Sequence, residues 1–151
     1  MPTYKYLLAE NVQDWTGGLV MEDGMFLACE STVSHQIQAR SNLSSAALGN
    51  EGLFNLKLAG NGACVLESNV PRSEIVEIEL QNDVLKIDGR FAICWSGSLT
   101  FTVERSGKTL IGSAASGEGL VNVYKGTGRV WLAPLTPSQS LFSATFAKNA
   151  K

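Results

Sequence analysis

Two glutamates, Glu51 and Glu118, are the residues whose type and spacing could do chemistry. They open two nearly identical stretches, EGLFN ending at Asn55 and EGLVN ending at Asn122, one in each half of the chain. If a pseudo-twofold brought the two carboxylates together, the pKa of one would rise, as a general acid–base pair requires. Alternatively, a glutamate beside a glycine accepts backbone N–H bonds in a turn, and an asparagine amide can do the same. We favour this structural role and keep Glu51, Asn55, Glu118 and Asn122 as candidate binding residues.

Other arrangements that could support catalysis or hold a cofactor are missing from the sequence. His35 is the single histidine, whereas a metal site inside a β-fold needs two or three histidines with a carboxylate. The stretch from Trp95 to Ser98 lacks the leading glycine of a Gly-x-Ser-x-Gly nucleophile motif. We therefore expect a non-catalytic protein with no cofactor and no metal, in which His35 is a polar strand or loop residue.

The charge balance does not favour a nucleic-acid partner. The formal net charge is −2, and lysine and arginine never form a run longer than one residue. Stacking of single-stranded bases would need aromatic rings beside a basic groove. The rings that could serve are Trp15, Trp95 and Trp131, and the cations near the paired motifs are Lys57, Lys125 and Arg129. Single-stranded RNA binding by a ring of subunits stays an alternative.

The two glutamate motifs belong to a longer duplication. A Gly-x-Gly turn follows each motif, at residues 60–62 and 126–128, and a short apolar run comes next. Earlier in each copy, an Asp-Gly pair separates two apolar runs, at residues 23–24 and 88–89, and aligning these pairs also aligns Cys29 with Cys94. We predict one domain spanning residues 1–151, built from tandem repeats at about 4–69 and 70–135 that share one core.

Within each repeat, the patterns predict strands. Asp-Gly and Gly-x-Gly between apolar runs indicate hairpins, and alternation predicts middle strands at residues 33–39 and 99–104. An opening strand is expected over residues 3–8. The chain should end in a short helix at about 137–148, because Thr136, Pro137 and Gln139 form a capping box.

Composition bounds the class of protein. The chain has 151 residues, 44% of them hydrophobic and 17% charged, with 15 glycines, which favours an all-β domain with many turns. Cys29, Cys64 and Cys94 all lie in apolar contexts and should be reduced thiols in the core. We find no secretory signal and no apolar run that could span a membrane, so we expect a cytoplasmic protein without membrane insertion.

The duplicated motifs, as an ordered set, resemble the altered inheritance of mitochondria family over most of residues 15–135. They are the stretches at 50–55 and 116–122, each followed by Gly-x-Gly, with Val130-Trp131-Leu132 after the second. The resemblance implies a relation to the trp RNA-binding attenuation protein, a double-stranded β-helix or β-sandwich, and assembly into rings or small oligomers. It supplies no agreed catalytic residues. Asn50 stands where the second copy has Gly117, so the two motifs are not fully equivalent.

We therefore expect an all-β homo-oligomer that serves as a scaffold or binding module, with other proteins as further partners. Besides RNA binding, the alternative is a small-molecule site between the two repeats, near Glu51 and Glu118.

Overall fold

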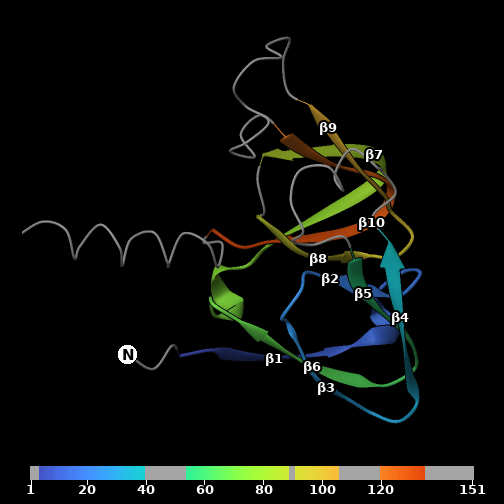
Figure 1. Ribbon diagram of the computed structural model, residues 1–151, viewed down its shortest axis with the longest axis vertical. Helices are drawn as coiled ribbons and strands as arrows, with labels where there is room; N and C mark the ends of the chain where they lie inside the picture. The colour runs from blue at the N-terminus through green and yellow to red at the C-terminus, as the bar shows by residue number, and fades with distance from the viewer. Residues whose placement is uncertain (1–3, 40–53, 89–90, 106–119, 135–151) are drawn as a thin grey trace, which may run out of the picture.

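The computed structural model describes residues 4–39, 54–88, 91–105 and 120–134, and these form two antiparallel β-sheets (Figure 1). Sheet A has the strand order β1-β6-β3, and sheet B has the order β4-β5-β2-β8-β10-β7, with β9 paired to β10. The strands are β1 (Tyr6–Asn11), β2 (Leu19–Met21), β3 (Phe26–Cys29), β4 (Val33–Ala39), β5 (Phe54–Gly60), β6 (Ala63–Ser68), β7 (Val76–Asp88), β8 (Ala92–Ser96), β9 (Thr100–Arg105) and β10 (Leu120–Leu132).

The described residues contain no α-helix; their only helical turns are the 3-10 segments η1 (Val12–Asp14) and η2 (Arg72–Glu74). The all-β class is therefore confirmed, and the arrangement is sandwich-like, with sheet A at the bottom of the view in Figure 1. The predicted C-terminal helix at about 137–148 lies outside the described residues.

The two hairpins predicted in the first half are wrong, although their turns exist, and the hairpin predicted at Gly126–Gly128 is wrong because β10 runs through these residues as one strand. Gly24 adopts a φ of +79°, as a turn glycine does, but β2 before it belongs to sheet B and β3 after it to sheet A. The Gly-x-Gly turn at Gly60 likewise leads from β5 in sheet B to β6 in sheet A. Both turns are corners at which the chain changes sheets, because β3 and β6 find their hydrogen-bonding partners in each other.

The strand registers of the two halves match through a shared bulge. In β3 and β6, Phe26 faces Leu66 and Ala28 faces Val65, so Leu27 is an extra residue in a bulge. In β8 and β10, residues Ala92 and Cys94 face Leu132 and Trp131, so the bulge recurs at Ile93. We call the shift along the chain that carries Leu27 onto Ile93 the repeat offset. It equates Cys29 with Trp95 rather than with Cys94, and the division into repeats of about 4–69 and 70–135 stays a prediction.

The second half differs from the first in the length of its strands. Residues 85–87 of β7 pair with β10 in the register that β2 has with β5, and the same repeat offset relates the two pairings. In the first half, β1 and β2 are separate strands in different sheets, whereas β7 runs through both positions as one strand of 13 residues. β10 likewise runs through the positions of β5 and β6, with an irregularity between Gly126 and Gly128.

Two hydrophobic clusters fill the interior. The first is centred on Trp15, Leu58, Leu66 and Trp131, and the second on Trp95, Tyr124 and Val130. All of these side chains are at most 2% exposed. β2 lies between the clusters, because Leu19 and Met21 belong to the first and Val20 to the second.

Candidate functional site

The structure places two of the four candidate binding residues. Asn55 is a buried residue of β5, opposite Gln38 of β4, and Asn122 is a half-buried residue of β10, between Ile87 and Val103. Both asparagines take part in interactions within the fold. The strands β2 and β8 lie between β5 and β10 in sheet B, so the two asparagines are not neighbours in the sheet. Glu51 and Glu118 lie outside the described residues.

His35 is a residue of the strand β4, which agrees with the prediction of a polar strand or loop residue, and it is exposed. The base-stacking hypothesis for the tryptophans is wrong, because the exposed fractions of Trp15, Trp95 and Trp131 are 2%, 2% and 0%. A nucleic-acid base cannot stack on a ring that the core already covers. The physical reason is packing: Trp95 lies against Phe101 and Tyr124, with ring centroids 5.5 and 5.3 Å away.

A group of charged side chains surrounds the other two tryptophans. The guanidinium of Arg129 lies 4.4 Å from the Trp15 ring centroid, and that of Arg72 lies 4.3 Å from the centroid of Trp131. Glu77 joins both arginines: its Oε2 is 2.9 Å from Arg72 Nη2, and its Oε1 is 3.5 Å from Arg129 Nη1. Trp131 Nε1–H donates to Glu77 Oε2 at 2.6 Å. We call Trp15, Arg72, Glu77, Arg129 and Trp131 the Trp–Arg cluster.

The Trp–Arg cluster fastens one sheet to the other. Trp15 follows η1, which continues from β1 of sheet A, while Arg129 and Trp131 belong to β10 of sheet B. The Arg129 guanidinium also donates to the main-chain oxygen of Asp14. Its charges are matched, because Glu77 faces both arginines and Glu10 lies beside Trp15. The residues of the Trp–Arg cluster therefore have a structural role, and none of them is a free nucleophile or base.

Glu10 is a half-buried carboxyl beside this cluster. Burial raises the pKa of Glu10, and this effect outweighs the hydrogen bond from Trp15 Nε1 at 3.4 Å and the attraction of Arg72 and Arg129.

No sequence motif marks the Trp–Arg cluster, because its members are spread from Trp15 to Trp131 and only the fold brings them together.

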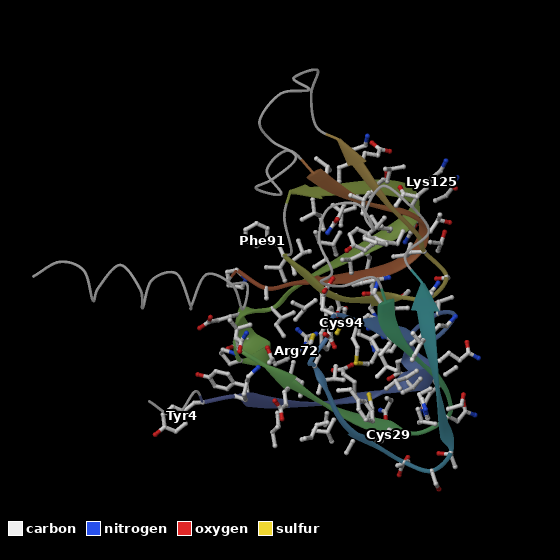
Figure 2. The ribbon with its side chains drawn as sticks, viewed as in Figure 1. Tyr4, Cys29, Arg72, Phe91, Cys94 and Lys125 are labelled. Atoms are coloured by element: carbon white, nitrogen blue, oxygen red, sulfur yellow. The ribbon has the colours of Figure 1, made fainter. Side chains whose placement is uncertain are left out.

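The cysteines are free thiols inside the sandwich. Cys64 and Cys94 are buried and Cys29 is half-buried; Figure 2 shows Cys94 in the middle of the molecule. Burial raises the pKa of the Cys64 thiol to about 11 and that of Cys94 well above its ordinary range. Within the part of the chain that the structure describes, no three His, Cys, Asp or Glu side chains are grouped to hold a metal ion.

The remaining candidate is an apolar surface on sheet A. Ala9 of β1, Val65 of β6 and Ala28 of β3 lie in one register row across the sheet, and all three are at least partly exposed. Four large apolar or aromatic side chains on its two outer strands are also exposed: Tyr6 (47%) and Leu7 (64%) on β1, and Phe26 (40%) and Leu27 (46%) on β3. We call these seven residues the sheet A surface. Apolar surface gathered on one sheet and its edges is typical of a protein–protein contact.

These features define an all-β sandwich-like protein with an apolar surface on sheet A. The chain belongs to the mitochondrial biogenesis AIM24 family, whose model matches residues 5–135, and the predicted family is thereby confirmed. It is 27% identical over 120 residues to the uncharacterized protein M6_Spy0233 of Streptococcus pyogenes serotype M6. That match covers 79% of this chain and 46% of the relative, so the chain spans less than half of the relative's length.

The fold is also similar to a solved crystal structure. Protein SPYM3_0169 from Streptococcus pyogenes superimposes with a TM-score of 0.67 at 23% identity, over 95% of this chain and 59% of that one. The likeness shows the fold alone. Among the described residues, no helix has the length and apolar character that crossing a membrane requires.

Proposed function

We propose that this AIM24-family protein is a non-catalytic homo-oligomer that acts as a scaffold or binding module, built as a double-stranded β-helix from two repeats. The observation that carries the proposal is the sheet A surface. Leu7 and Leu27, on opposite edges of a three-stranded sheet, are 64% and 46% exposed, whereas Leu8 and Leu66 of the same sheet are 5% and 0% exposed. Large apolar side chains on an exposed sheet edge favour pairing with another chain.

The chemistry of the described side chains agrees with a scaffold. Glu77 pairs with both arginines of the Trp–Arg cluster, and Cys64 and Cys94 are buried thiols whose raised pKa values disfavour the reactive thiolate. A cytoplasmic location is part of the proposal.

Static light scattering at micromolar concentration tests the assembly. We expect a mass that is a multiple of the 16.1 kDa chain. A mass of one chain at every concentration would contradict the proposal. RNA binding gains no support from the structure, because the tryptophans that would stack bases are buried.

A further inference from the structure

The pairing of β2 with β8 within one chain shows how two copies of the chain could pair with each other. These strands join the two halves of the chain: Met21, Val20 and Leu19 of β2 face Cys94, Trp95 and Ser96 of β8 in antiparallel register. Main-chain bonds extend the pairing at both ends, from Glu22 N to Ile93 O at 2.9 Å and from Gly97 N to Gly18 O at 2.8 Å. We call this pairing the seam.

Each strand of the seam has an equivalent strand in the other half of the chain, related to it by the repeat offset. Both equivalent strands have one edge with no described partner strand. The repeat offset moves β8 onto β3, an outer strand of sheet A that pairs only with β6 among the described strands. It moves β2 onto residues 85–87 of β7, an outer strand of sheet B that pairs only with β10 there. The main-chain N–H of Val84 at this edge bonds to the side chain of its own neighbour, Asp83, at 2.7 Å. Both halves of the contact are thus present in one chain, on outer strands of different sheets.

Burial shows what the β3 edge lacks. Ile93, whose main-chain oxygen accepts the bond at one end of the seam, is 8% exposed, whereas the equivalent Leu27 of β3 is 46% exposed. Covering Leu27 would remove apolar surface from water, which stabilises an interface. A strand added beside β3, as β2 lies beside β8, would cover this side chain.

We propose that β3 of one copy pairs antiparallel with residues 85–87 of β7 in a second copy, so that Cys29 of the first lies opposite Lys86 of the second. The inference rests on the proposed homo-oligomer and names the surfaces that build it. Because the two edges are different surfaces, the contact is head-to-tail, and its repetition gives a closed ring or an open filament.

Side-chain volumes and charges fit this register. In the seam, the row across the strands is Ile78, Val130, Trp95 and Val20, with a large ring beside a small side chain. The equivalent row in the proposed contact is Glu10, Cys64, Cys29 and Lys86 of the second copy, with a small thiol beside a long side chain. In this contact Lys86 would lie on the face of sheet A that also carries Glu10, so the row would have opposite charges at its two ends. In the single chain, Lys86 is 57% exposed and pairs with Glu104 at 2.8 Å.

The proposed pairing ends where the two backbones of the seam approach too closely for residues that carry side chains. A Cβ on Gly97 would lie 2.3 Å from the main-chain oxygen of Gly17, so the backbones there approach more closely than side chains allow. The equivalent residues are Ser31 and Asp83, which carry side chains. The contact therefore covers only the positions from Leu27 to Glu30 and their partners in β7.

A single substitution allows the proposed register to be tested by disulfide cross-linking. Directly opposed residues of antiparallel strands have Cα atoms about 4.5–5.5 Å apart, which a disulfide can bridge. The exposed Lys86→Cys variant, oxidised with diamide, should give a ladder of linked dimers, trimers and larger species on a non-reducing gel. Mass spectrometry should find the peptide with Cys29 joined to the peptide with position 86. Adding Cys29→Ser should abolish the ladder and leave at most dimers.

A matched control uses the same strand. Glu79 is exposed on β7, at a distance from Lys86 of roughly 23 Å along the strand. Glu79→Cys should give no ladder. Ladders of equal strength from both variants would overturn the register, because they would reflect random collision.

Light scattering separates this inference from the proposed function. If the wild type is oligomeric but Cys29 and position 86 do not cross-link in the folded Lys86→Cys variant, the inference is overturned and the homo-oligomer stands. If Lys86→Cys does not fold, a second variant tests the inference. Leu27 is 46% exposed, and Leu27→Lys should reduce the mass to that of one chain. Ile37 of β4 is 72% exposed, and Ile37→Lys should leave the mass unchanged. An unchanged mass for Leu27→Lys would overturn the inference.

Discussion

Trp15 and Trp131 meet edge to face, with ring centroids 5.0 Å apart and ring planes 68° apart. One ring follows the end of β1 in sheet A and the other belongs to β10 in sheet B, so this contact joins the two sheets. Aromatic pairs of this geometry are worth about 0.5–1.5 kcal/mol beyond the area they bury. Each ring is also covered by an arginine, and Glu77 holds both arginines.

Glu77→Ala should destabilise the fold by about 1–3 kcal/mol, because it removes the acceptor of the buried Trp131 Nε1–H and leaves that donor unsatisfied. Urea unfolding followed by tryptophan fluorescence measures the change. Glu79→Ala, an exposed glutamate two positions along β7, should stay within about 0.5 kcal/mol of wild type. Equal losses for the two variants would show that Glu77 does not hold the cluster.

Gly18→Ala should cost more stability than Gly24→Ala. Both glycines have positive φ, +96° and +79°, so each substitution brings backbone strain of roughly 1–2 kcal/mol. Only at Gly18 would the new Cβ also meet a main-chain oxygen, that of Leu58 at 2.5 Å; nothing lies within 4 Å of a Cβ on Gly24. Thermal unfolding of the two variants compares strain alone with strain plus a clash. A smaller loss at Gly18 would contradict the close approach of β2 and β5.

Local patterns in the sequence predicted the strands but not their partners. Alternation located β4 and β9, and Asp23-Gly24 marked a real turn. An Asp-Gly pair, however, fixes only the local backbone. β3 pairs with β6 because its side chains pack there, and a short stretch of sequence does not contain the information that selects this partner strand. The repeat was visible from the glutamate motifs, but its offset at β3 and β8 could be set only by the shared bulge at Leu27 and Ile93.

The site was harder to predict for the same reason. Tryptophans can stack on bases or fill a core, and their spacing in the sequence does not distinguish the two roles. Arg72, Glu77 and Arg129 carry no motif, because the cluster is assembled from η2, β7 and β10. The exposure of Leu27 likewise depends on where sheet A ends, which is a property of the whole topology.

Only one of the three thiols should react quickly with a disulfide reagent such as DTNB. The raised pKa values of Cys64 and Cys94 keep them protonated at pH 8, and both are buried, whereas Cys29 is half-buried. The Leu27→Lys variant suits the measurement, since we expect the edge at Cys29 to be uncovered in it. One thiol per chain should react before urea is added and two more afterwards, and Cys29→Ser should remove the fast one. Fast reaction of two thiols would show that the interior is open to the reagent.

Glu10→Gln should change how stability depends on pH. A carboxyl whose pKa is raised on folding binds its proton more tightly in the folded state, so its contribution to stability is fully present below its unfolded pKa, near 4.5, and is lost as pH rises through the folded value. Glutamine cannot lose a proton and still offers an oxygen to Trp15 Nε1–H. The stability of Glu10→Gln relative to wild type should therefore increase between a pH below 4.5 and neutral pH. Urea midpoints at both values measure this, with Glu74→Gln as the exposed control. A difference between Glu10→Gln and wild type that stays constant with pH would mean that Glu10 is as well solvated by Arg72, Arg129 and water as it is in the unfolded chain.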